Sequence, residues 1–459
     1  MWLTPLFERF VENSPVTVIV RTLMEVVLAE AKLDNLFEQT AQTGYTREIL
    51  FSTLVNMMIQ VVCSVRQSIG AVYQAMADEL GVSKAAVYGK LNRLEPSVSQ
   101  ALVRSTAQEL ATLVRQVGGQ QPLLCPKYRQ KIVDGNGLGA TDHRLSVLRD
   151  NGAGALPGKS LVVLDPVLGL AIDIFPCEDG HAQERSLLPL VLKTVEAGDL
   201  WIGDRNLCTT GFLFGLDSRQ AAFIIRQHQN LPWQAETQLV WKGDTDGGQV
   251  FDQTGVVNYE GQQLRCRRVV VRLEQPTRDG ESEIALLTNL PDTDAAAVLV
   301  AQLYRKRWRI ETLFQVATET FHCEIKTLGY PRAALFSFCM ALVAYNLFSA
   351  LKAILGSVHG TDVAGKLSDY YLADELEGTY RGMMIALPPT EWLDFGQMSL
   401  PQLSSLLQDW AGKVNLPAFT SAPRKPKKPK PKPPYDPAHP HVSTARLLAQ
   451  KKKSRASPD

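Results

Sequence analysis

Residues 304–311 have the sequence YRKRWRIE, which separates Tyr304, Arg307 and Glu311 by three and four positions. In a helix with 3.6 residues per turn, these three side chains lie on one face. Two interpretations of this face are open. Arg307 and Glu311 can form an exposed ion pair, which contributes only about a few tenths of a kcal/mol. Alternatively, Glu311 binds a metal ion while Tyr304 and Arg307 face a phosphate backbone, which explains a lone carboxylate among so many cations.

Two aspartates further upstream each follow a short apolar run. Residues 130–137 read QKIVDGNG and residues 199–206 read DLWIGDRN, so both segments predict a strand that ends at an aspartate. Open α/β sheets bind ligands at the carboxyl ends of their strands, so we expect Asp134 and Asp204 to point into a crevice. The alternative is a turn aspartate that bonds its own backbone. Together with Glu311 they form an Asp–Asp–Glu set, which favours a shared site.

This set resembles the DDE triad of bacterial insertion-sequence transposases, within the RNase H-like integrase superfamily. Tyr304, Arg307 and Glu311 match the Y-x2-R-x3-E part of the signature that marks the insertion-sequence four family. The resemblance runs from about residue 60 to about residue 450. The signature closes with a lysine seven residues after the glutamate, and this chain has Thr318 there. In the family that lysine helps to hold DNA phosphates, so we expect weaker end binding here.

The resemblance implies a metal-dependent phosphoryl transfer. Asp134, Asp204 and Glu311 would be catalytic residues that bind two divalent ions, Mg²⁺ or alternatively Mn²⁺, because Mg²⁺ prefers an oxygen shell. Water would first cut DNA at the end of the element, and the freed 3′-hydroxyl would then attack target DNA in cut-and-paste transposition. Related members flip a base against a tryptophan of the β insertion. Trp241 or Trp233 could serve here, although a core position is the alternative for either.

The implied partner is double-stranded DNA, as element ends and as target, bound by a homodimer in the bacterial cytoplasm at the nucleoid. Two other functions are compatible with the same fold. One is a catalytically retired or domesticated DNA-binding regulator, although all three acids are retained. The other is a metal-dependent nuclease without strand transfer, which the sequence leaves open.

Composition indicates a large globular protein. The chain has 459 residues, of which 45% are hydrophobic and 21% charged, so it can form several domains with ample core. Its seven cysteines show no C-x-x-C spacing, which argues against a disulfide framework or a zinc site and favours a reducing compartment. The amino terminus shows no signal-peptide pattern. Residues 334–350 are apolar but shorter than a membrane span, so we predict a buried helix and no membrane partner.

The net charge of +1 conceals an uneven distribution. From Arg424 to Asp459 there are 11 Lys and Arg against two Asp, a net charge of +9, so the remaining chain carries −8. A basic tail on a mildly acidic body is common in nucleic-acid-binding proteins, although a solubilising tail has the same composition. Lys and Pro alternate over Lys425–Lys432 and predict disorder, whereas the apolar side chains within His441–Leu448 predict a segment that packs.

A helix-turn-helix is predicted near the amino terminus. Residues 68–80 and 84–94 have helical patterns and are joined by a turn that contains Gly81. The second helix carries side chains suited to phosphates and base edges, namely Lys84, Tyr88, Lys90 and Arg93. The alternative is an ordinary helical hairpin.

The fold class predicted is mixed α/β, with an RNase H-like catalytic core, an inserted all-β domain and a preceding helical DNA-binding domain. Strands are expected at 131–134, 160–165 and 170–175, followed by a helix over about 183–197 and the strand ending at Asp204. The helix that carries Glu311 is expected to begin at Asp294 as its N-cap. The predicted divisions are a helical DNA-binding domain 1–115, core 126–214, β-rich insertion 215–290, core 291–356, helical region 357–420 and disordered basic tail 421–459.

Overall fold

The computed structural model describes residues 3–43, 49–277, 280–421 and 440–456. The Lys-Pro run Lys425–Lys432, predicted to be disordered, therefore lies outside the described residues.

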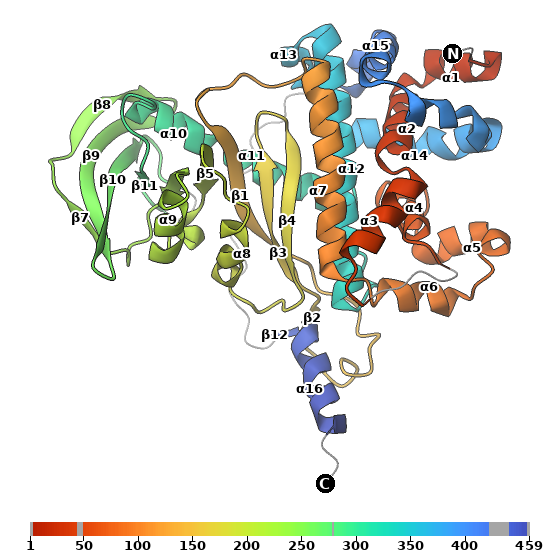
Figure 1. The fold of residues 1–459 in the computed structure, drawn as a ribbon, viewed down its shortest axis with the longest axis horizontal. Coiled ribbons are helices and arrows are strands. Elements are labelled where there is room, and N and C mark those ends of the chain that lie inside the picture. The colour runs from red at the N-terminus through yellow and green to blue at the C-terminus, as the bar shows by residue number, and fades with distance from the viewer. Residues whose placement is uncertain (1–2, 44–48, 278–279, 422–439, 457–459) are drawn as a thin grey trace.

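The amino-terminal region is helical wherever the structure describes it. Its helices are α1 (Pro5–Asn13), α2 (Pro15–Val27), α3 (Glu30–Thr40), α4 (Phe51–Val62), α5 (Ile69–Leu80), α6 (Lys84–Leu91) and α7 (Pro96–Gln116). The last of these, α7, packs lengthwise against α12 (Pro331–His359) and also contacts strand β4 (Leu170–Cys177) of the sheet (Figure 1). Removing residues 1–115 would therefore remove part of the central core, not a separable unit.

A mixed sheet forms the centre of the molecule. In chain order, the first five strands of this sheet are β1 (Arg129–Gly137), β3 (Lys159–Asp165), β4 (Leu170–Cys177), β5 (Asp199–Gly203) and β6 (Ala222–Arg226). They are arranged β4-β3-β1-β5-β6; β1 is antiparallel to β3 but parallel to β5, which is parallel to β6. The mixed α/β class is therefore confirmed, and this order is consistent with an RNase H-like core.

The same sheet continues into the predicted β insertion. Beyond β6 follow β11 (Glu283–Thr288), β10 (Gln262–Leu273), β9 (Gly248–Tyr259) and β7 (Trp233–Ala235), with β8 (Val240–Thr245) also paired to β9. Because β11 pairs directly with β6, these strands extend the central sheet and curve away from α7 and α12 (Figure 1). That residues 215–290 form a domain of their own stays a prediction.

Helices cover both faces of the central strands. Ile132 and Leu200 point to the face covered by α7, α12 (Pro331–His359) and α11 (Trp308–Glu319). Val133 and Trp201, one residue along each strand, point to the face covered by α8 (Leu188–Leu192) and α9 (Thr210–Asp217). This alternation follows from the two-residue repeat of a strand.

The apolar stretch at 334–350 lies within α12. At 29 residues α12 is longer than predicted, and among the described residues it is the one helix long and apolar enough to cross a membrane. However, 89% of its most apolar window is buried inside the protein. The predicted buried helix is therefore confirmed.

The helix expected at 183–197 is shorter and divided. Residues Glu184–Leu187 form a 3₁₀ turn, and α8 then ends at Leu192. Pro189 lies in the first turn of α8. Because proline has no backbone N–H to donate, the earlier turn does not continue as an α-helix through this position.

The carboxyl-terminal part returns to the central core. Helices α13 (Thr361–Ala364), α14 (Asp369–Ala386) and α15 (Leu400–Ala411) follow α12. The short strand β12 (His441–Ser443) pairs in parallel with β2 (Gly154–Leu156), and α16 (Thr444–Ala456) projects from it (Figure 1). Arg446 Nε donates to Asp179 Oδ2 at 2.7 Å. The segment His441–Leu448 therefore packs, as predicted, whereas the prediction of a disordered tail over 421–459 is wrong for residues 441–456.

Candidate functional site

The helix expected to carry Tyr304, Arg307 and Glu311 is interrupted. Helix α10 (Ala297–Arg305) contains Tyr304, Arg307 is the N-cap of α11, and Glu311 lies in the first turn of α11. Between the helices, the amides of Lys306 and Arg307 bond carbonyls three residues earlier, which is the tighter 3₁₀ pattern. The prediction of one continuous helix was wrong, although the three side chains remain close together.

The start of this segment also differs from prediction. The N-cap of α10 is Ala296, not Asp294. The Asp294 carboxylate instead accepts from Tyr128 Oη at 2.8 Å and from the Lys127 ammonium. Since both of its oxygens are engaged by the linker before β1, Asp294 anchors that linker.

Arg307 lies at the centre of the site. Its Nη1 donates to Asp134 Oδ2 at 2.6 Å, and its Nη2 donates to Glu311 Oε1 at 2.7 Å. The arginine is 8% exposed. The predicted Arg307–Glu311 ion pair is therefore present, and its Glu311 side chain is 41% exposed. The pair is not a simple surface pair, because the guanidinium is buried and also bonds Asp134 from a different element. Asp134 precedes Arg307 by 173 residues.

Asp204 directly follows β5, the strand next to β1. The parallel register pairs Val133 with Gly203, so the residue after each member of this pair is one of the two aspartates. Strand β1 itself continues to Gly137 by pairing with β3, so Asp134 is not at its end as predicted. Asp204 Oδ1 accepts from the Asn206 amide at 2.8 Å, which is the bond expected of a turn aspartate.

The acids influence one another electrostatically. Burial raises the pKa of Asp134 to about 7; Arg307 opposes this rise, while the charges of Asp204 and Glu311 add to it. A carboxyl group with this pKa is only partly ionised near neutrality. Extra positive charge at this position would favour its ionised form.

The donor chemistry of these acids suits a hard divalent cation, because carboxylate oxygens are the ligands that Mg²⁺ prefers. Within the described residues, no group of three His, Cys, Asp or Glu side chains is already arranged around a metal position. Arg307 binds Asp134 and Glu311 where such an ion would need them. The residues fit a metal chemically, and Arg307 engages one oxygen of Asp134 and one oxygen of Glu311.

Comparison with known proteins identifies this region. Residues 131–347 match a family model described as a transposase DDE domain. Residues 131–347 are therefore similar to a transposase DDE domain, and they are called the DDE domain below. A Sinorhizobium fredii protein named "Putative transposase y4zB" is 29% identical over 156 residues, covering 33% of this chain and 42% of that protein. The chain thus matches less than half of the length of this relative.

The DDE domain contains two arginines that sequence reasoning missed. Arg205 follows Asp204, and Arg226 ends β6; both donate to the carboxylate of Glu281. The charge of Arg226 also opposes the rise that burial causes in the pKa of Tyr304. No local pattern reveals this cluster, because Glu281 lies 76 and 55 residues from its partners.

Glu184 was also missed. Gly135 has no side chain, and a Cβ atom built there would lie 2.3 Å from the Glu184 carboxyl carbon. Asn206 Nδ2 donates to Glu184 Oε2 at 3.4 Å. The glycine after Asp134 therefore leaves room for the Glu184 carboxylate beside β1. This glycine is the one feature of the sequence that indicates the close approach.

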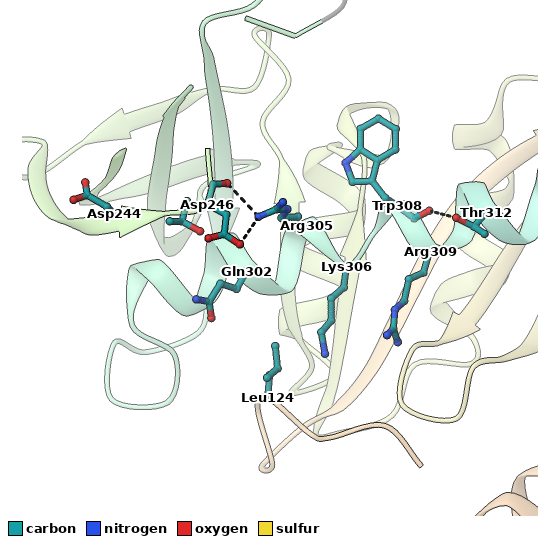
Figure 2. Close-up of a pocket in the computed structure, with 10 residues that line it drawn as sticks. Leu124, Asp244, Asp246, Gln302, Arg305, Lys306, Trp308, Arg309 and Thr312 are labelled. Carbon is teal, nitrogen blue, oxygen red and sulfur yellow. Dashed lines mark hydrogen bonds and ion pairs between the residues drawn. The ribbon is translucent and has the colours of Figure 1, made fainter. Parts of the chain in front are cut away.

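A pocket of about 830 Å³ lies along α10 and the start of α11 in the DDE domain. Figure 2 shows Lys306 and Arg309 pointing to one side of the helices, whereas Trp308 points to the other. Arg305 bonds Asp246 of the β8–β9 turn at 3.1 Å.

Three tryptophans of the DDE domain differ in exposure. Trp308 is 60% exposed and Trp241 of β8 is 55% exposed, so a core position is wrong for Trp241. Trp233 is partly buried against the core beside α9. Stacking of Trp241 or Trp233 on a flipped base stays a prediction.

The predicted helix-turn-helix residues lie on α5 and α6, away from the acids (Figure 1). Gly81 ends α5 with a left-handed φ of 62°, and the Ser83 hydroxyl caps α6. Lys84 at the start of α6 and Arg93 just after its end are exposed, whereas Tyr88 and Lys90 on α6 are half-buried. The Lys90 ammonium lies 4.9 Å from the centre of the Phe37 ring. Their role in DNA binding stays a prediction.

Proposed function

We propose that this protein is a DNA transposase of the insertion-sequence four family, which cuts DNA at its element's ends and joins it to target DNA. The observation that carries the proposal is the contact of one buried arginine with two acids. Arg307 bonds Asp134 from β1 and Glu311 from α11. All three residues lie within the region that matches a transposase DDE domain, which supports a catalytic role for them.

Asp134, Asp204 and Glu311 would hold two divalent ions, Mg²⁺ or Mn²⁺. Such ions activate an attacking oxygen and stabilise the leaving oxygen of a phosphodiester. Arg307 would exchange its carboxylate partners for a DNA phosphate, since its forked guanidinium suits both. Tyr304, which is 8% exposed and whose ring centre lies 5.9 Å from the guanidinium, would orient Arg307 during this exchange.

DNA recognition is assigned to α6, with Lys84, Tyr88, Lys90 and Arg93 as the contact residues. The support is the turn before α6 and the exposure of Lys84 and Arg93. Cutting two ends and joining them to one target would require a homodimer, acting at the nucleoid in the cytoplasm.

The decisive experiment measures nicking and joining separately on duplexes that carry the element's own ends. With Mg²⁺ we expect nicking first and joining second, and neither step with Ca²⁺ in its place. Nicking without joining would identify a nuclease. Specific binding without nicking, in both Mg²⁺ and Mn²⁺, would identify a retired DNA-binding protein and overturn the proposal.

A further inference from the structure

Glu281 connects two arginines at one end of the DDE domain. It lies in the turn between β10 and β11, where its amide bonds Thr277 Oγ1 at 3.1 Å. One carboxylate oxygen accepts from Arg205 Nη2 and the other from Arg226 Nη2. Each oxygen of a single carboxylate thus has its own guanidinium.

This cluster borders the acids. Arg205 directly follows Asp204, and Arg226 ends the strand beside β5. The charges of Arg226 and of Asp204 both influence the pKa of Tyr304, the neighbour of Arg307. A DNA strand reaching the acids would therefore pass close to both arginines.

Two guanidinium groups converging on one carboxylate leave a net positive charge. Their forked donors match the oxygens of a phosphate as well as those of a carboxylate. The three side chains are 40%, 22% and 33% exposed, for Arg205, Arg226 and Glu281 respectively. Ion pairs with this much exposure are weak, so a competing anion can replace the glutamate.

We infer that Arg205 and Arg226 form a phosphate-binding site beside the acids, and that Glu281 fills it until a DNA backbone phosphate displaces it. Glu281 acts as an internal substitute for that phosphate and lowers the affinity of the free chain for DNA. This inference rests on the proposed function, since it assumes a DNA substrate.

The test compares Glu281→Gln with Glu283→Gln in the full chain. Glu283 lies two residues away on β11 and pairs with Arg272 at 2.7 Å, so both variants remove one negative charge from the same hairpin. Affinity is measured without metal for a duplex of mixed sequence, because phosphate contacts do not depend on sequence. We expect Glu281→Gln to bind about 3- to 10-fold more tightly, roughly 1 kcal/mol, and Glu283→Gln to bind like the wild type.

A gain in affinity is informative because a damaged fold does not produce one. Adding Arg226→Gln to Glu281→Gln should abolish the gain, because the freed guanidinium is then missing. Equal gains in both single variants would reflect long-range charge and overturn the inference, as would no gain in either. If the wild type bound no DNA at all, the proposed function would fail together with the inference. A wild type that binds and cuts while Glu281→Gln behaves like Glu283→Gln overturns the inference alone.

Discussion

The acid cluster, formed by Asp134, Asp204, Glu311 and Arg307, and helix α16 differ in how their positive charges are paired. In the acid cluster, Arg307 is buried and bonds two carboxylates. Beside it, Glu281 pairs with two further arginines. On α16, Lys452, Lys453 and Arg455 are exposed and form no ion pair within the described residues. The cations near the acids are therefore paired with carboxylates, whereas the three on α16 are exposed to solvent and can contact an anion directly.

This difference separates two contributions to DNA binding. Cations without acid partners attract any nucleic acid by releasing condensed counterions. Cations bonded to carboxylates contribute only after an exchange of partners, which requires a phosphate at one particular position. We therefore expect α16 to supply non-specific affinity and the acid cluster to limit chemistry to correctly placed DNA.

The strongest test removes each acid in turn. Asp134→Ala, Asp204→Ala and Glu311→Ala should each lower Mg²⁺-dependent cleavage by at least about 10³-fold, because a lost metal ligand removes several kcal/mol of transition-state stabilisation. DNA binding, measured by gel shift, should remain largely intact. Asp246→Ala is the matched control, since among the described residues that exposed acid pairs only with Arg305. Near-normal cutting by any of the three variants would remove that acid from the site.

A third set of cations, on α6, should determine which sequence is bound. Lys84→Glu and Arg93→Glu should each weaken binding to the element's end by about 1–3 kcal/mol, with less effect on mixed-sequence DNA. Point substitutions are needed because deleting residues 1–115 would remove most of α7 from the core. Lys413, which is exposed just after α15, provides a control for net charge as Lys413→Glu. Equal losses in all three variants would contradict the assignment.

Helix α16 should affect affinity without affecting sequence preference. Replacing Lys452, Lys453 and Arg455 by alanine should make the salt dependence of binding shallower by up to about three units, one for each lost phosphate contact. Substituting Lys425, Lys427 and Lys428 gives the same charge change and should have a smaller effect.

Deletion from Arg424 should likewise lower affinity at high salt more than deletion of Lys425–Lys432 alone. A chain truncated at Ser421 that binds and cuts like the full chain across a salt titration would show that the tail is passive.

The smallest effect is expected at Thr318. A lysine there should add one phosphate contact and steepen the salt dependence by about one unit. Thr318 is half-buried, and its Oγ1 lies 3.8 Å from Cys323 Sγ, so the new side chain must leave this contact to reach DNA. An unchanged salt slope for Thr318→Lys would show that position 318 does not approach DNA.

Sequence spacing predicted the acid cluster better than it predicted the local backbone. Asp134 and Asp204 follow matching apolar runs, and the parallel register places them side by side. Residues 304–311 contain no glycine or proline, so propensity indicates an unbroken helix. The interruption coincides with the contacts of Arg307, whose partner on β1 is 173 residues away, and no local pattern reports such a distance.

The Glu281 cluster was unpredictable for the same reason. Its three charged residues come from separate elements, and each alone resembles an ordinary surface residue in the sequence. Gly135 carried a weak signal, since a glycine within a strand often marks a close approach, here by Glu184. Such approaches become visible only when the packing of the sheet is known.

The separation of Asp134 from Arg307 also has a consequence during protein synthesis. The ribosome adds about 5–20 residues per second, so the 173 residues between them take roughly 10–35 s to make. During that interval the growing chain has an aspartate on β1 without the arginine that later binds it. An unfinished chain that ends before α11 therefore cannot assemble the acid cluster, because Arg307 and Glu311 are both missing from it.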